Sequence, residues 1–335
     1  MKDALLFAGK KASKIASGTY VNITTKSPVV FKMLYKAGNA ISSDKHKSVI
    51  YFANKGYGEN LYRYICKNNI DAVVTSHLFP AEALTYLKRK KGLKTVCFGI
   101  ATDYTSIPFW EETELDYYFI PHRDLFDEFK SKCISGEQLV STGIPVSKKF
   151  SVKSDKAEAR KSLGLRESGR IILIMTGSMG YGNIEKLTDT LLNSADENTE
   201  IVILGGNNEK LKGRLRCKYS ADFVKVIDFT DKVDVYMDAC DIIFTKPGGL
   251  TSTEAAVKNI PIIHTDPIPG CETINAEFYS SRGMSVTSGS IEELVKKAYN
   301  ILNDINLQAH MIECQKKEIN KNSNDLICDF ILSHI

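Results

Sequence analysis

The alternation of apolar runs with helical patterns is the feature that most limits how this chain can fold. In the second half of the sequence, five short runs rich in Ile, Val and Leu recur, and helical patterns separate them. Short apolar runs that alternate with helices are typical of βαβ units and parallel sheets. The predicted strands are Arg170 to Thr176, Glu200 to Gly205, Phe223 to Ile227, Asp241 to Thr245 and Ile260 to Thr265.

The same alternation is found earlier in the chain. A polar, charged stretch from Ser147 to Lys161 then predicts an interdomain linker. A chain of 335 residues can bury two cores, so we expect domains at residues 1–150 and 151–335, the second with a helical end from Ser290 to Leu332. In the first domain we expect helices at Ser48 to Asn68 and Pro80 to Arg89, and strands at Asp71 to Ser76, Lys94 to Ile100, Leu115 to Pro121 and Gln138 to Thr142.

Composition excludes several classes of protein. No apolar run approaches the roughly 20 residues that a membrane-spanning helix needs, and the first residues do not resemble a secretory signal. The eight cysteines are scattered without a CxxC pair, and no histidine cluster has ligand spacing. We therefore expect a cytoplasmic protein without a disulfide framework or a metal site.

Positive charge is concentrated at the start of the chain. Residues 1–47 hold nine lysines and two acidic residues, a formal charge of +7, and apolar residues lie between the lysines. This composition predicts an amphipathic segment at an anionic membrane surface, so we expect a peripheral membrane protein. The alternative is a solvated lysine face on ordinary helices. Nucleic-acid binding ranks third, because no nucleic-acid-reading motif accompanies the charge.

A glycine turn between a strand and a helix is the first candidate binding site. The apolar run Cys240 to Phe244 leads into TKPGGLTSTEA, which predicts a strand, a turn in which adjacent glycines adopt positive φ, and a helix. Amides and hydroxyls at a helix N-terminus favour an anion, so we expect this turn to bind a phosphate. Glu254, in the first turn of the helix, is placed to accept hydrogen bonds from a ribose diol. The other residues assigned here are Pro247, Gly248, Gly249, Thr251 and Ser252.

A second polar loop follows the next predicted strand. Gly270, Cys271, Glu272 and Asn275 come after Ile260 to Thr265. The carboxyl ends of parallel strands lie at one edge of the sheet, where ligands of open α/β sheets bind. The alternative is that the glycines of both loops serve packing alone. We favour a binding site, because glycines, hydroxyls and carboxylates follow two successive strands.

These two segments also carry a family resemblance. TKPGGLTSTEA followed by PIPGCETINA is similar to the donor-nucleotide half of the family 28 glycosyltransferases, in particular the monogalactosyldiacylglycerol synthases and processive diacylglycerol glucosyltransferases. ATDYTSIPFW, STGIPVSKKF, LIMTGSMGYGN and ILGGNN match in the same order, so the resemblance covers nearly the whole chain.

The resemblance implies an α/β fold of the GT-B class, in which two Rossmann-like domains face each other across a cleft. The family binds the donor in its second domain and the acceptor in its first, and transfers the sugar without a metal or other cofactor. The absence of a DxD motif between a strand and a loop agrees with metal-free transfer.

The resemblance also assigns further donor residues. Phe229 falls where the family seats the uracil, Glu272 where it contacts hexose hydroxyls, and Asn275 near the diphosphate. Two positions depart from the family pattern: Cys271 replaces a glutamine, and Ser147 replaces an arginine that meets the diphosphate, for which Lys148 or Lys149 could substitute. The remaining donor residues belong to the predicted strands Arg170 to Thr176 and Glu200 to Gly205 or to the loops after them. They are Gly177, Ser178, Gly180, Gly205 and Asn207.

On the acceptor side the resemblance points to Asp103, Tyr104 and Trp110, and to His77 after an earlier strand. Trp110 has an alternative role in packing, and for His77 we favour a structural role. The family also opens with a glycine-rich Gly-His loop whose histidine is the expected general base. MKDALLFAGKKASKI resembles the segment after that loop, so we expect an upstream start, a partner chain that supplies the missing piece, or an impaired protein. Asp103 is then the candidate catalytic residue.

Together these observations predict a membrane-associated hexosyltransferase. It would move a hexose from a UDP-sugar, the co-substrate, to diacylglycerol or a similar lipid by inverting displacement. One alternative is transfer of N-acetylglucosamine to a polyprenyl-linked acceptor. Another is a catalytically impaired protein that binds a UDP-sugar or a membrane.

Overall fold

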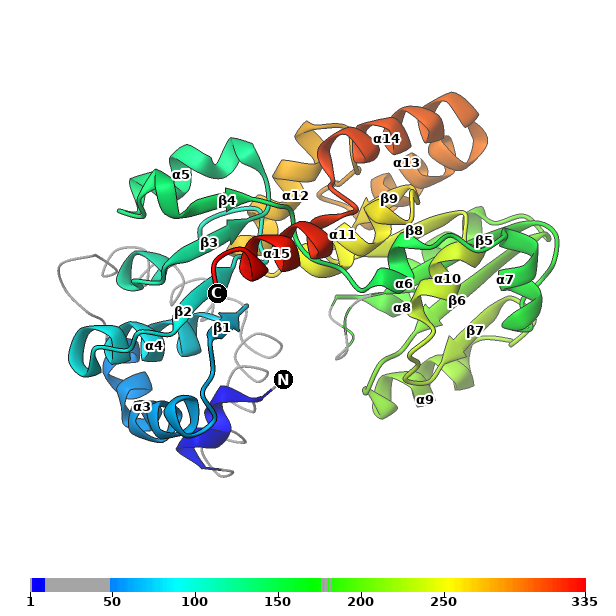
Figure 1. Ribbon diagram of the computed structural model, residues 1–335. Coiled ribbons are helices and arrows are strands. Elements are labelled where there is room, and N and C mark those ends of the chain that lie inside the picture. Colours follow the sequence, from blue (N-terminus) through cyan, green and yellow to red (C-terminus); the bar gives the residue numbers. More distant parts are fainter. Residues whose placement is uncertain (1, 10–48, 176, 178–179, 181) are drawn as a thin grey trace. The chain divides into compact units, whose positions relative to one another are not determined.

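The computed structural model describes residues 2–9, 49–175, 177, 180 and 182–335. The chain forms two compact units, each built around its own parallel sheet (Figure 1). The first unit comprises Met1–Pro145, Pro269–Cys271 and Asn322–Ile335, and the second comprises Val146–Ile268 and Glu272–Lys321. All nine predicted strands are present, and their ends lie within two residues of the predicted ends.

The first unit has a four-stranded parallel sheet in the order β1-β2-β3-β4. The strands are β1 (Ala72–Thr75), β2 (Val96–Ile100), β3 (Tyr117–Ile120) and β4 (Leu139–Ser141). The helices before β4 are α3 (Val49–Lys67), which packs against α4 (Leu78–Lys91), and α5 (Phe126–Ser131). Short 3₁₀ turns join them, and the turn at Ala4–Ala8 packs on α3 through the rings of Phe7 and Tyr64.

The last helix of the chain belongs to this first unit. α15 (Ser323–Leu332), the red helix of Figure 1, places Ile327 and Phe330 on the sheet residues Phe98 and Phe119. The rings of Phe119 and Phe330 meet edge to face at 5.5 Å. The sequence pattern assigned the whole helical end to the second domain, and for α15 that assignment is wrong. A helix of this pattern can cover either sheet, and here Ile327 and the partly buried Phe330 pack into the core of the first.

The second unit has a five-stranded parallel sheet in the order β7-β6-β5-β8-β9. In chain order this is 3-2-1-4-5, so the connections reverse direction between β5 and β8. Such a switch point is where open α/β sheets bind ligands. The strands are β5 (Arg170–Met175), β6 (Thr199–Leu204), β7 (Val224–Ile227), β8 (Ile242–Thr245) and β9 (Ile262–His264).

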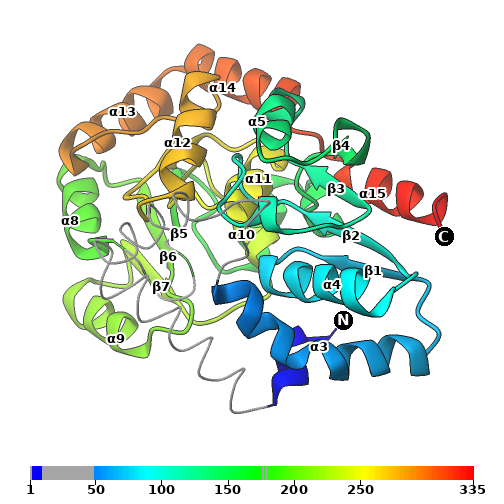
Figure 2. The ribbon, with the colours of Figure 1, turned by 90° about the vertical axis from the view of Figure 1, so that its left-hand side faces the viewer.

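Helices cover both faces of this sheet (Figure 2). One group shares an apolar core with the strands: α8 (Ile184–Ser194), α9 (Glu209–Lys218) and α13 (Ile291–Asn303). A second group packs in pairs, α7 (Lys156–Ser162) on α10 (Val233–Ala239), and α11 (Gly249–Val257) on α14 (Ile305–Glu318). α12 (Cys271–Ser281) follows the loop after β9.

The segment from Ser147 to Lys161, predicted as an interdomain linker, belongs to the second unit. It contains α6 (Lys148–Ser151) and most of α7, and buried charges hold it to the second unit. Lys258 Nζ donates to the carbonyl of Val152 at 2.6 Å, and Arg160 Nη2 pairs with Asp241 at 2.8 Å. Polar groups of this segment therefore form specific hydrogen bonds and ion pairs with the second unit.

Candidate functional site

The switch point of the second sheet brings together the two glycine-containing loops. β5 and β8 pair in parallel up to Met175 and Thr245, so the loops that follow them start side by side. Gly177 has φ +79°, and a Cβ at this position would lie 3.0 Å from Cε of Lys246. The loop after β5 and the turn after β8 therefore approach each other closely at Lys246.

The turn after β8 leads directly into α11. Gly248 is the N-cap residue, and no side chain caps the helix. The N–H groups of the first turn have no acceptor within the helix, which leaves them for a ligand. The expectation of positive φ at these glycines is wrong: Gly248 has φ −74°, and Gly249 is not among the residues with positive φ. A Cβ at Gly248 would lie 3.6 Å from Lys246 Nζ and 3.7 Å from Oε1 of Glu272, so the turn passes directly beside these two charged groups.

Asn275 holds the turn after β8 in place through a backbone hydrogen bond. Its fully buried side chain, on α12, donates from Nδ2 to the carbonyl of Pro247 at 3.0 Å. The resemblance placed Asn275 near the diphosphate. In the structure its amide supports the backbone from which α11 starts.

Ser252 serves the packing of α11 as well. Its hydroxyl is completely buried and lies 3.0 Å from Nε2 of His264, whose Nδ1 lies 3.0 Å from the hydroxyl of Ser285. Burial lowers the pKa of His264 to about 3, so the ring is neutral. We assigned the Ser252 hydroxyl to the donor site, but the structure directs it into the protein interior. Thr251 is half-buried at the helix start.

Glu254 lies one turn into α11 and is half-buried. Burial raises the pKa of its carboxyl to about 7, and the positive charge of Lys149 opposes this shift. Lys149 also pairs with Asp234 at 3.1 Å and donates to the carbonyl of Asp231. Lys149 is one of the two lysines that the sequence offered in place of the family arginine. Its ammonium is therefore held beside α10.

Two other strand ends carry predicted donor residues. Phe229 follows β7, and its side chain is 70% exposed, which leaves the ring available for stacking. Asn207 follows β6 and is exposed. Gly205 has a packing reason to be glycine, because a Cβ there would lie 2.4 Å from Cγ of the buried Lys212.

An ion pair at the turn was missed in the sequence. Lys246, the first residue after β8, contacts Oε1 of Glu272, and Oε2 of Glu272 accepts from the backbone N–H of Ile268 at 2.9 Å. Glu272 is buried, and both its oxygens are engaged. The signal that could have found Lys246 is its position in TKPGG, directly at a strand end and next to the glycines.

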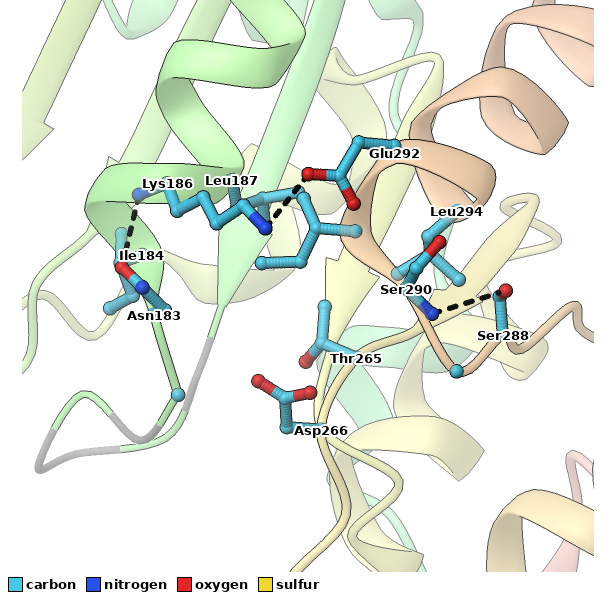
Figure 3. Close-up of a pocket in the computed structure, with 13 residues that line it drawn as sticks. Asn183, Ile184, Lys186, Leu187, Thr265, Asp266, Ser288, Ser290, Glu292 and Leu294 are labelled. Carbon is cyan, nitrogen blue, oxygen red and sulfur yellow. Dashed lines mark hydrogen bonds and ion pairs between the residues drawn. The ribbon is translucent and has the colours of Figure 1, made fainter.

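The loop after β5 borders a pocket of about 330 Å³. Gly182, Asn183 and Asp266 line one side, and Lys186 of α8 points toward Glu292 of α13 across it, at 2.8 Å (Figure 3). None of the predicted donor residues lines this pocket. Of the predicted residues in the loop, Gly180 has φ +65°, and a Cβ there would lie 2.5 Å from Leu211; Ser178 lies outside the described residues.

The acceptor-side residues lie in the first unit, and two of them are buried in its core. Tyr104 is 1% exposed and Trp110 is 3% exposed, with the Trp110 ring against Tyr118 at 5.8 Å. The expectation that these rings line an acceptor surface is therefore wrong, and the packing role suits Trp110. Asp103 is half-buried in the loop after β2.

His77 caps α4. Its Nδ1 accepts from the backbone N–H of Phe79 at 3.2 Å, and its ring meets that of Phe79 at 4.7 Å. Partial burial of the ring lowers the pKa of His77. These contacts support the structural role that we favoured for this residue.

The charged start of the chain, residues 1–47, lies mostly outside the described residues, so the structure does not bear on its predicted membrane contact. Within the described part of the chain, no helix combines the length and apolar character needed to cross a bilayer.

Two protein-family models match the chain, one in each half. The family described as monogalactosyldiacylglycerol (MGDG) synthase matches residues 1–146, and glycosyl transferases group 1 matches residues 155–318. A processive diacylglycerol beta-glucosyltransferase of Bacillus cereus (strain B4264) is 28% identical over 288 residues, which cover 85% of this chain and 72% of the relative. The enzyme of the same name from strain AH187 is 27% identical over 317 residues, covering 94% and 80%.

Solved structures share the fold at lower identity. MurG of Acinetobacter baumannii superposes with a TM-score of 0.62 at 15% identity, over 84% of this chain and 79% of MurG. MnaA of S. aureus, solved with UDP, has a TM-score of 0.61 at 15% identity, over 85% and 82%. Anabaena HepE in complex with UDP has a TM-score of 0.57 at 13% identity, over 83% and 82%.

Proposed function

The chain belongs to the glycosyltransferases related to monogalactosyldiacylglycerol synthase and processive diacylglycerol glucosyltransferase, and from this premise we propose that it transfers a hexose from a UDP-sugar to diacylglycerol. Its fold is of the GT-B class, as the sequence predicted, with two units of parallel sheet and covering helices. The product would be a glycolipid.

The observation that carries the proposal is the switch point between β5 and β8. The open N-terminus of α11, the ammonium of Lys246 and the loop beginning at Gly177 meet there. Backbone amides at a helix start and a nearby cation suit an anion such as a diphosphate. The nucleoside would extend toward Glu254, which accepts from the ribose diol, and toward Phe229, whose exposed ring can stack on the base.

The reaction that such a site supports is a direct displacement. The acceptor hydroxyl attacks the anomeric carbon, the bond from that carbon to the diphosphate oxygen breaks, and UDP leaves with the bonding electrons. The hydroxyl proton passes to a base. Asp103, which follows β2 in the first unit, is the candidate for that base. Asp103→Asn tests it, since loss of the base should lower kcat by about 10²- to 10⁴-fold.

The acceptor implies contact with a membrane, because diacylglycerol is dissolved in lipid. We propose that the basic segment of residues 1–47 draws the protein to an anionic surface. Transfer to a polyprenyl-linked acceptor is supported only by the fold shared with MurG, which at 15% identity carries no information on substrate.

A turnover assay tests the proposed function. The chain is incubated with vesicles that contain diacylglycerol and with UDP-glucose, UDP-galactose or UDP-N-acetylglucosamine, and both UDP release and glycolipid mass are measured. We expect a hexosyl-diacylglycerol with UDP-glucose or UDP-galactose. UDP binding without any turnover would support the binding-protein alternative, and turnover with a polyprenyl-linked acceptor alone would support the other.

A further inference from the structure

We propose that Lys246 is the cation that binds the donor diphosphate and stabilises the charge on UDP as it leaves. This inference rests on the proposed function and assigns a role in the reaction to a residue that neither the sequence motif analysis nor the fold assigned. It begins from the place of Lys246 in the second unit, as the first residue after β8 at the switch point.

The side chain of Lys246 lies between the two glycine positions. Its Cε would be 3.0 Å from a Cβ on Gly177, and its Nζ would be 3.6 Å from a Cβ on Gly248. The end of this side chain therefore lies beside the first turn of α11, whose amides already favour an anion.

The ammonium is held in this place by a fixed carboxylate. Glu272 contacts Nζ with one oxygen and accepts from the N–H of Ile268 with the other, so the carboxylate cannot turn away without losing a backbone hydrogen bond. A lysine ammonium has three N–H donors. Within the described residues Glu272 is the hydrogen-bonding partner of Nζ, so two donors remain for the oxygens of a ligand.

The two members of this ion pair differ in exposure. The side chain of Lys246 is 24% exposed and that of Glu272 is 9% exposed, so the ammonium is the member that a ligand can reach. Lys149, one substitute named from the sequence, pairs with Asp234 of α10 at 3.1 Å, whereas Lys246 pairs with Glu272 beside the glycine turn itself. Lys246 is therefore the ammonium that lies at that turn.

The chemistry gives Lys246 a role in the transition state as well as in binding. When the bond between the anomeric carbon and the diphosphate oxygen breaks, its electron pair stays on the oxygen, and the diphosphate gains a negative charge. A preorganised ammonium beside that oxygen stabilises the product-like charge more than the ground state. Removal of the positive charge should consequently lower kcat as well as the affinity for UDP.

The test compares three ligands of increasing charge: uridine, UMP and UDP. Lys246→Met keeps the length of the stem and removes the ammonium. We expect calorimetry to show a loss of UDP affinity of roughly 10- to 100-fold, as for one hydrogen bond to a charged group, with uridine affinity nearly unchanged. Lys246→Arg should restore much of the UDP affinity. In turnover assays Lys246→Met should lower kcat beyond its effect on KM.

Controls separate this inference from the proposed function. Lys297→Met removes a lysine from an ion pair on α13 and should leave all three affinities unchanged. Unchanged uridine binding shows that the Lys246→Met variant is folded. If that variant does not fold, Lys246→Gln replaces it in the test, because the glutamine amide can still donate to Glu272. If the wild-type chain neither binds UDP nor turns over, the proposed function is wrong. If it does both, and the neutral variant keeps the wild-type preference for UDP over UMP and uridine, only the role of Lys246 is wrong.

Discussion

The carboxyl group of Glu254 should make donor binding depend on pH near neutrality. Burial raises its pKa to about 7, and a ribose diol donates to the ionised carboxylate. We therefore expect uridine affinity to increase as the pH rises from about 6 to about 8, and to level off above that. Glu254→Ala should weaken UDP binding at pH 8 by about 1.5 to 3 kcal/mol. Calorimetry with uridine is the measurement, because UDP itself titrates in this range.

The matched control is Glu254→Gln, which keeps the shape and removes the titration. Because the pKa of Glu254 in the folded state is raised, its contribution to stability is fully present at acidic pH and is lost as the pH rises through about 4.5 to 7. Glu254→Gln should therefore be more stable than the wild type at pH 8 and no more stable at pH 4. An equal pH profile of uridine binding in wild type and Glu254→Gln would remove Glu254 from the site.

At the scale of elements, one buried ion pair joins three segments of the second unit. Lys258, which follows α11, pairs with Asp238 of α10 at 2.6 Å, and Lys258 also donates to Val152. The N–H of Ser154 donates to the same Asp238 oxygen at 3.2 Å. Both charged side chains are almost fully buried, so each depends on the other for charge compensation.

We expect Lys258→Met to lower the free energy of unfolding by about 3 to 5 kcal/mol, because it leaves a buried carboxylate without its cation. The double variant Lys258→Met with Asp238→Leu should recover most of that loss. Urea denaturation measures both. Lys297→Met, which removes a partly exposed ion pair, is the control and should change stability by about 1 kcal/mol or less. A loss below about 1 kcal/mol in Lys258→Met would show that the segments are held by other contacts.

At the scale of the whole molecule, the charge at the start of the chain predicts how the protein reaches its acceptor. If residues 1–47 dock electrostatically, liposome binding should require anionic lipid. It should also weaken with salt, since the Debye length falls from ~10 Å at 0.1 M to ~3 Å at 1 M. Co-sedimentation at the two salt concentrations measures this, and equal binding to neutral liposomes would contradict it.

The sequence by itself determined the local elements and the loops of the donor half. The strands were predictable because each is a short apolar run bounded by polar or glycine residues, and that signal depends on neighbours along the chain. The glycine turn and a helix after it were also predicted from their place along the chain. Because α11 begins at Gly249, however, Glu254 lies beyond the first turn in which the sequence placed it.

Only the tertiary structure decided what distant residues do to one another. α15 has an apolar face that either sheet could have covered, and its Ile327 is buried against the first sheet with Phe330 packed beside it. Tyr104 and Trp110 follow a strand just as ligand-binding residues do, yet packing from other segments buries them. Lys246 and Glu272 are 26 residues apart and form a pair because β8 and α12 bring them together. Contacts of this kind depend on how the elements pack in three dimensions, which the spacing of residues along the chain does not encode.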